Sequence, residues 1–344
     1  MPSNVKSVAF ATLFLCLAAG CTPKAPVRDA VTLEGGIMGT VYHVKLIGAL
    51  DEAATAAAAG AIEDALQRVD AKMSTYKPDS ELSRLNVAPA GAPVAVSDET
   101  FSVIALAQQV NAESEGAFDI TVGPLVNAWG FGPPDQAEAP DDGQLAALLA
   151  LTGADKIALD AEKHTITKAA DGVYCDLSAI AKGYAVDQVH AALIALGHAD
   201  FMVEVGGEVR TAGLNANNMP WRIAIEKPVD QKRVIHGLVG LSNVALATSG
   251  DYRNFYLAEG KRISHTINPR TGRPVDHSLA SVSVIHPECA LADAYATAMM
   301  VLGPEAGLAF AEKQGLAVLF ILHGEDGHFT TRQTAAFAPY LVSH

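Results

Sequence analysis

The segment from 173 to 197 shows a clear change from one hydrophobic pattern to another. Apolar side chains recur every three or four residues over its second half, at Val186, Val189, Leu193 and Leu196. This spacing places them on one face of an α-helix. Ser178 is a residue type that caps helix N-termini, and Gly197 stands where a left-handed residue commonly ends a helix. The segment therefore predicts a strand, a tight turn and a helix.

Short strands and helices follow one another in no regular order along the rest of the chain. Alternating patterns between turn residues predict strands at 41–47, 156–159, 165–168, 201–205, 208–213, 221–226, 237–241, 244–248, 281–286 and 317–322. Helical spacing predicts helices at 51–69, 97–113, 144–151, 291–302 and 304–314. Loops are expected at 74–86 and 130–143, and an extended piece at 117–125. This irregular order favours an α+β fold with a mostly antiparallel sheet over a doubly wound one.

The first twenty residues differ in kind from the rest of the chain. Lys6 precedes an apolar run from 8 to 19, and small residues then lead to Cys21. The run is too short to span a bilayer as a permanent helix, and the small residues before a cysteine resemble the lipobox of bacterial lipoproteins. We therefore predict a signal peptide at 1–20, lipidation of Cys21, a tether at 21–32 and a domain at 33–335. An ordinary secretory signal with a chance cysteine is the alternative.

Charge and cysteine content narrow the possible partners. The chain has 344 residues and a formal net charge of −14, which becomes −15 once Lys6 is removed with the signal peptide. This balance argues against nucleic acid or anionic lipid as the main partner. Cys175 and Cys289 remain beyond the lipid site, in a compartment that permits disulfides. The sequence leaves open whether they pair or stay as two buried thiols.

Lys182 stands in the first turn of the helix predicted after 178. The positive end of the helix dipole should disfavour a cation there. Exposed amides at a helix start, a neighbouring lysine and Gly183, which permits close backbone approach, together suit a phosphate or pyrophosphate. A lysine that is simply solvated is the competing interpretation.

Asp293 and Thr297 are four residues apart in a predicted helix and so share one face. A carboxylate and a hydroxyl are hard oxygen ligands, which Mg²⁺ takes in small number while it keeps water and substrate phosphates. The alternative is structural: an Asp in the first turn and a Thr that bonds back to a helix carbonyl.

The segment from 262 to 274 places a histidine before an Asn-Pro-Arg-Thr-Gly turn. His265 is a candidate general base, because imidazole titrates near neutrality, and Arg270 is a candidate phosphate contact. A buried structural histidine and a solvated arginine are the alternatives. Gly206 and Gly207 indicate close approach of the backbone to a strand or a ligand. The chain has no Walker A loop, strand–GxGxxG–helix unit, HExxH or GxSxG motif, which removes support from the corresponding enzyme classes.

Taken together, these motifs resemble the FAD:protein FMN transferase family, the ApbE-like lipoproteins. The resemblance runs from about 34 to 329 and rests on eight segments in the family's order. They are Met38–Thr40, Met73–Tyr76 with Ser80 and Glu81, Phe118–Pro124, Asp176–Tyr184, Gly206–Glu208, Thr248–Gly250, His265–Gly272 and Ala292–Thr297. The family fold is α+β and related to the T-fold.

The resemblance implies an activity and a set of site residues. The family transfers FMN from FAD to a Ser or Thr hydroxyl of a target protein, typically a subunit of a membrane redox complex, and releases AMP. Its acceptors carry the sequence Asp-x-x-Ser/Thr-Gly-Ala-Thr. The implied FAD contacts are Met38, Tyr76, Ala117, Phe118, Asp119, Asp176, Lys182 and Ile267. The implied Mg²⁺ ligands are the carbonyl of Ala179 with Asp293 and Thr297. Some members have a second Asp where this chain has Ala296, so one carboxylate fewer is expected at the metal.

The expected mechanism places Lys182, Asp293 and His265 in catalytic roles. Mg²⁺ and Lys182 neutralise the pyrophosphate, the acceptor hydroxyl attacks the FMN phosphorus in line, and His265 takes the proton. Two alternatives remain: hydrolysis of FAD to FMN and AMP, and a lipoprotein that binds FAD without chemistry. The resemblance further implies a protein anchored by its lipid on the periplasmic side of the inner or outer membrane.

Overall fold

The structure is a computed structural model that describes residues 27–133, 139–229, 234–251, 254–258, 261–324 and 328–342. The predicted signal peptide, the lipidation site at Cys21 and part of the loop expected at 130–143 lie outside these ranges. Among the described residues, no helix combines the length and the hydropathy that crossing a lipid bilayer requires.

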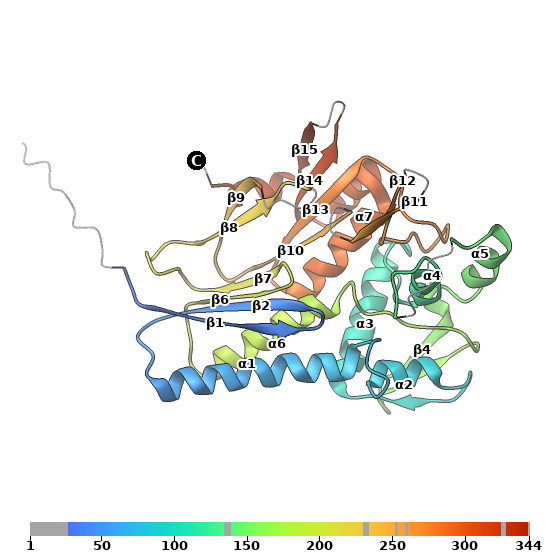
Figure 1. Cartoon of the computed structure of the whole chain (residues 1–344), viewed down its shortest axis with the longest axis horizontal. Coiled ribbons are helices and arrows are strands. Elements are labelled where there is room, and N and C mark those ends of the chain that lie inside the picture. Colours follow the sequence, from blue (N-terminus) through green and yellow to red (C-terminus); the bar gives the residue numbers. More distant parts are fainter. Residues whose placement is uncertain are drawn as a thin grey trace, which may run out of the picture.

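An eight-stranded sheet forms the centre of the molecule (Figure 1). Its order is β1-β2-β6-β7-β10-β13-β14-β15, and every neighbouring pair is antiparallel. The strands are β1 (Ala30–Ile37), β2 (Thr40–Ile47), β6 (Phe201–Val205), β7 (Glu208–Ala212), β10 (Ala245–Gly250), β13 (Leu279–His286), β14 (Ala317–His323) and β15 (Phe329–Gln333). The α+β class and the antiparallel sheet are confirmed.

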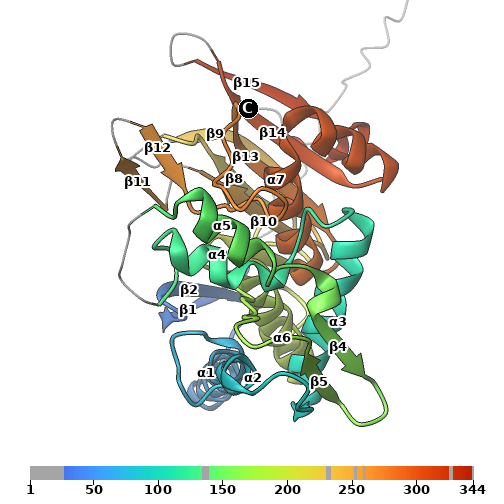
Figure 2. The ribbon, with the colours of Figure 1, turned by 90° about the vertical axis from the view of Figure 1, so that its right-hand side faces the viewer.

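Three long helices cover one face of this sheet and enclose the main core with it. They are α1 (Glu52–Met73), α6 (Ala181–Ala195) and α7 (Cys289–Lys313). Helix α6 contacts both α1 and α7, while α7 packs on β10 and β13. Gly303 has φ 79° and interrupts α7, which accounts for the two separate helices predicted there. Figure 2 shows α1 on the opposite side of the molecule from β14 and β15.

The other face of the sheet carries a two-stranded sheet, β8 (Trp221–Glu226) and β9 (Ile235–Leu241), and the 3₁₀ helix η4 (Ala335–Tyr340). Ile225 and Val239 from the small sheet are buried there against Leu246, Ile285 and Phe337. Both faces of the central sheet are therefore covered, which agrees with the nearly continuous burial of β13.

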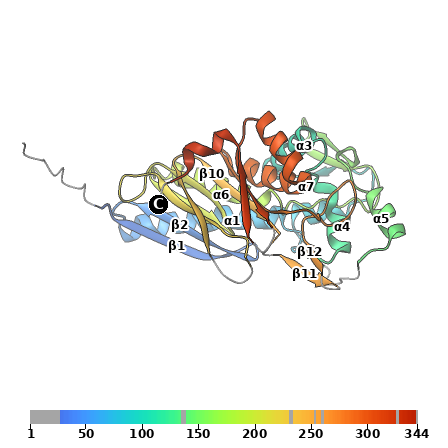
Figure 3. The ribbon, with the colours of Figure 1, turned by 90° about the horizontal axis from the view of Figure 1, so that it is seen from above.

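Further helices and short strands gather at one end of the molecule, where Figures 1 and 3 both show α3, α4 and α5. They are α2 (Glu81–Val87), α3 (Asp98–Glu113), η1 (Ile120–Val122), α4 (Gly123–Ala128), α5 (Asp142–Leu149) and η2 (Ala154–Lys156), with the strands β3 (Val94–Ala95), β4 (Ile157–Asp160) and β5 (Thr165–Lys168). The hairpin β11 (Phe255–Ala258) and β12 (Lys261–Ser264) lies nearby. The expected hairpin of β4 and β5 is confirmed.

Several local predictions are wrong. Ser178 does not cap α6; the Asp176 side chain accepts the Ser178 amide at 2.8 Å, and this turn delays the helix until Ala181. Gly197 does end the segment with φ 86°, as expected. The piece expected to be extended at 117–125 is largely helical, because Asp119 caps η1 and a proline stands in the first turn of α4. A helix, α2, occupies half of the loop expected at 74–86, since Ser80 caps its first turn.

Candidate active site

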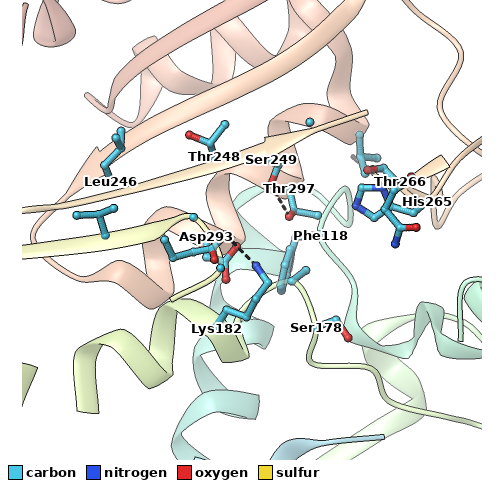
Figure 4. Close-up of a pocket in the computed structure, with 18 of the residues that line it drawn as sticks. Phe118, Ser178, Lys182, Leu246, Thr248, Ser249, His265, Thr266, Asp293 and Thr297 are labelled. Carbon is cyan, nitrogen blue, oxygen red and sulfur yellow. Dashed lines mark hydrogen bonds and ion pairs between the residues drawn. The ribbon is translucent and has the colours of Figure 1, made fainter. Parts of the chain in front are cut away.

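A cavity of about 710 Å³ opens where the central sheet separates. Strands β7 and β10 pair only at Arg210 with Ala245 and Val209 with Leu246. Beyond these pairs the turn after β6 and the end of β10 both line the cavity, and α6 and α7 line it from the helical side. Figure 4 shows Lys182 and Asp293 between Leu246 on one side and His265 on the other.

Lys182 and Glu208 form an ion pair inside this cavity. The Nζ atom of Lys182 lies 2.8 Å from Oε1 of Glu208, whose side chain is only 4% exposed. Burial would lower the pKa of Lys182, but the charges of Asp293 and Glu208 outweigh it and raise that pKa above its ordinary value. Burial also raises the pKa of Glu208 to about 7, while Lys182 opposes this shift. The ammonium of Lys182 therefore stays protonated at neutral pH and lies in the wall of the cavity.

Asp293 lies in the first turns of α7 and is 3% exposed. Its Oδ2 accepts the backbone N–H of Gly183 at 3.0 Å. Burial raises the pKa of Asp293, and Lys182 and this hydrogen bond act in the opposite direction. Gly183 serves a different purpose from the one expected: a Cβ there would meet the carbonyl oxygen of Cys289 at 2.4 Å. The close approach in this structure is to the backbone of α7.

Thr297 and Ala179 line the same cavity as Asp293. The hydroxyl of Thr297 is 3.0 Å from that of Ser249 at the end of β10. Within the described ranges, no group of three or more His, Cys, Asp or Glu side chains is arranged to hold a metal ion. A carboxylate, a hydroxyl and a backbone carbonyl nevertheless form a set of hard oxygen donors. Such a set fits Mg²⁺, which commonly takes one or two carboxylates and completes its shell with water and phosphate.

Asp187 fixes the start of α7 against α6. Its Oδ1 accepts the Cys289 N–H at 3.0 Å and its Oδ2 accepts the Ala290 N–H at 2.9 Å. Helix α7 has no side-chain cap of its own, so Asp187 supplies the acceptors that its first amides lack. Arg210 of β7 donates to the same carboxylate at 2.5 Å. These contacts of Asp187 hold α7, which carries Asp293, in a fixed position against α6, which carries Lys182.

The other residues expected to contact FAD line the same cavity, except Met38. Tyr76, Ala117, Phe118, Asp119, Asp176 and Ile267 all line the cavity. Asp119 accepts the Thr121 N–H at 2.8 Å and its hydroxyl at 2.6 Å, and burial raises the pKa of Asp119. Met38 has φ 50° and is not among the described residues that line the cavity. Lys182 is thus joined in one space by six of the seven other residues expected to contact FAD.

His265 also lines the cavity, whereas Arg270 does not. The Nδ1 of His265 lies 2.9 Å from the carbonyl oxygen of Asn254, so Nδ1 donates and Nε2 can accept a proton in the neutral ring. Burial lowers the pKa of His265. Arg270 instead donates to the Glu115 carbonyl at 2.6 Å and lines a separate hollow of about 210 Å³. The structure does not bring Arg270 to the proposed phosphate position.

Cys175 and Cys289, whose pairing the sequence left open, are both buried free thiols. Burial raises the pKa of Cys175 to about 12, and the pKa of Cys289 is also raised by burial. Neither thiol is activated as a nucleophile in this environment.

Glu208 and Ser249 are site residues that sequence reasoning quoted within motifs but gave no role. The signal for Glu208 was an acid directly after two glycines and before a buried strand, since a buried acid in such a place requires a cationic partner. Ser249 gave no comparable signal, because its contact depends on how β10 meets α7.

Known proteins are similar to this chain in sequence and in fold over nearly their whole length. A sequence model of the ApbE family matches residues 38–320. An FAD:protein FMN transferase from Haemophilus influenzae is 46% identical over 315 residues, which cover 89% of this chain and 90% of that protein. Another from Vibrio cholerae is 43% identical over 335 residues, with 97% and 98% covered.

Two solved structures agree with the sequence comparison. The flavin transferase ApbE from Vibrio cholerae has a TM-score of 0.82 and 42% identity, with 91% of this chain and 100% of that chain covered. The apo form of the flavinyl transferase ApbE from Pseudomonas stutzeri has a TM-score of 0.84 and 39% identity, with 92% and 98% covered. From its sequence and its fold alike, this chain belongs to the ApbE family.

Proposed function

We propose that this protein transfers FMN from FAD to a Ser or Thr hydroxyl of a target protein and releases AMP. The observation that carries the proposal is the meeting of Lys182, Asp293 and Thr297 in one cavity. The ammonium of Lys182 and the two oxygen donors of Asp293 and Thr297 lie beside aromatic and polar residues. This arrangement suits a dinucleotide with a diphosphate bridge. The relatives named FAD:protein FMN transferase support the same substrate.

Ala179, Asp293 and Thr297 would hold a Mg²⁺ ion in this protein. Its chemistry there would be to reduce the negative charge on the diphosphate oxygens. The set has a single carboxylate, because Ala296 stands beside Thr297, so several positions on the ion would remain for water and phosphate.

The chain's own groups account for binding and proton transfer. Lys182 attracts the diphosphate, and Glu208 holds the ammonium in place until the substrate enters. The acceptor oxygen attacks the FMN phosphorus in line, and the bond from that phosphorus to the bridging oxygen breaks. AMP leaves with the bridging oxygen, and the hydroxyl proton passes to Nε2 of His265.

The N-terminal sequence supports a location for this reaction. We infer that Cys21 is lipidated after removal of 1–20 and anchors the domain on the periplasmic side of the inner or outer membrane. A target subunit of a membrane redox complex would then lie on the same surface. Globomycin, which blocks lipoprotein signal cleavage, should retain the precursor; normal processing in its presence would contradict the anchor.

The test uses the full chain in detergent with FAD, MgCl₂ and a peptide containing Asp-Ala-Val-Thr-Gly-Ala-Thr. We expect a covalent flavin–peptide adduct and one AMP per adduct. Free FMN and AMP without adduct would indicate a pyrophosphatase, and intact bound FAD would indicate storage; either contradicts the proposal.

A matched pair of variants tests the metal site. Asp293→Asn should lower turnover at limiting Mg²⁺ at least tenfold, since removing a charge-assisted contact costs about 1.5–3 kcal/mol. Asp64→Asn changes an exposed carboxylate on α1 and should leave turnover unchanged. Equal Mg²⁺ dependence in both variants would remove Asp293 from the metal site.

A further inference from the structure

One wall of the cavity comes from β8, which the expected FAD contacts do not include. Five consecutive residues of this strand line the space, from Arg222 to Glu226. Side chains of consecutive strand residues point to opposite faces. Ile223 and Ile225 pack toward the core beneath β8, whereas Arg222 and Ala224 are exposed. No described residue of β9 lines this cavity, so the cavity lies along the edge of β8 that faces away from β9.

This edge carries backbone groups with no strand beside them. Among the described strands, β8 pairs with β9 alone. Unpaired N–H and C=O groups along a strand edge form a template for another extended segment. Recognition by strand addition uses such an edge for affinity and the neighbouring pockets for specificity.

The edge of β8 is continuous with the reaction centre. Met202, Glu204 and the turn at Gly206 and Gly207 line the same cavity, and this turn leads directly to Glu208. Glu204 accepts the Gly207 N–H at 2.7 Å with one carboxylate oxygen and contacts His43 Nδ1 at 2.6 Å with the other. The turn is thus held in a fixed shape beside the Lys182 ion pair.

We propose that the edge of β8 binds the acceptor protein, which adds an extended segment as a third strand to β8 and β9. This inference rests on the proposed function, because the reaction requires a Ser or Thr hydroxyl at the diphosphate. Each residue of an extended segment advances it by about 3.3 Å. A hydroxyl beyond the paired stretch would lie in the same cavity that Lys182 and His265 line.

The two ends of this wall carry opposite charges, Arg222 at one end and Glu226 at the other. Arg222 is exposed and forms no ion pair with another described residue. It presents a cation at a cavity edge in a chain whose net charge is −14. An acidic side chain of the acceptor segment would pair with Arg222 at that end.

The test is a backbone scan of the acceptor, so that the enzyme stays unchanged. Fluorescein-labelled peptides containing Asp-Ala-Val-Thr-Gly-Ala-Thr receive one N-methyl amide at successive positions. Their affinity for the full chain is measured by anisotropy, and their labelling by adduct formation. We expect methylation at every second residue on one side of the Thr to weaken binding about tenfold, because each such group loses one hydrogen bond and clashes with β8. The intervening positions should bind as the parent peptide does.

The outcomes separate this inference from the proposed function. A period-two loss of affinity without adduct formation would keep the docking edge and overturn the transfer reaction. Adduct formation with a flat or non-alternating scan would keep the reaction and overturn the docking edge.

A chain variant provides an independent measurement. Ala224→Trp places an indole beside this edge and should raise the KM for the peptide about tenfold, and by much more than it raises the KM for FAD. Ala195→Trp, at an exposed position of α6 outside the cavity, should change neither. Equal changes in both KM values would overturn the proposal. So would an Ala224→Trp chain that changes from dimer to monomer with an unchanged peptide KM, since a second copy would then occupy the edge.

Discussion

Gly183→Ala should damage the active site through a single methyl group. A Cβ at Gly183 would lie 2.4 Å from the Cys289 carbonyl oxygen, 2.7 Å from its carbon and 2.9 Å from the Cα of Ala290. Optimal non-bonded contacts lie near 3.5 Å, so α6 and α7 must separate by about 1 Å. All three atoms belong to the helix backbone, which cannot rotate away as a side chain does. The Gly183 N–H would then lose its 3.0 Å contact with Asp293.

Two effects on stability oppose each other in this variant. Overpacking costs about 1–3 kcal/mol, whereas alanine in a helix is favoured over glycine by about 1 kcal/mol. We expect a net loss of about 1 kcal/mol in the free energy of unfolding. The activity should fall much further, because a 1 Å misplacement of reacting groups costs about a hundredfold.

Gly60→Ala is the matched control, because Gly60 is exposed within α1 and a Cβ there meets nothing within 4 Å. It should raise stability by up to about 1 kcal/mol and leave turnover unchanged. Urea unfolding followed by circular dichroism and AMP release with FAD and acceptor peptide measure the two quantities. A Gly183→Ala protein with the turnover of the parent would refute the argument that this contact sets the position of Asp293.

Three further predictions concern charge. Glu208→Gln should remove a pH dependence of the free energy of unfolding. The pKa of Glu208 is raised from 4.5 to about 7 in the folded state, so the stability that this group contributes is lost as the pH rises from 4.5 to 7. A difference in unfolding free energy between variant and parent that does not change with pH would contradict this. Asp187→Ala should lower the free energy of unfolding in urea by about 3 kcal/mol, because it uncaps α7 and leaves Arg210 without its partner. Asp155→Ala breaks an exposed ion pair and should lower it by less than about 1 kcal/mol. Equal losses would refute the role of Asp187 in holding α7 against α6. Because burial lowers the pKa of His265, the acid limb of the turnover profile should lie below pH 6.5, and a limb retained in His265→Gln would exclude this residue as the base.

Sequence reasoning located the helical and strand-forming stretches where periodicity was strong. It found the residues at 201–205 and 221–226 with the bounds that the strands have. It failed where one polar contact decides the outcome: Asp176 delays α6, and Ser80 starts α2 in a segment that reads as a loop. Such contacts leave little trace in a hydrophobic pattern, because one hydrogen bond overrides several weak propensities.

Most residues that line the site could be predicted from the sequence, but the contacts between them could not. Lys182 was singled out because its position in a first helical turn is unfavourable, and the structure places two carboxylates beside it. A sequence cannot tell whether a ligand or another helix approaches a glycine, and at Gly183 the structure shows a helix, α7. Glu208 needed the three-dimensional neighbour that its burial requires.

The contact between Gly183 and Asp293 joins positions 110 residues apart in the chain. Contacts of this sequence separation close late in folding, since long loops must be ordered first. The substrate cavity therefore cannot exist on a nascent polypeptide until the ribosome has completed α7.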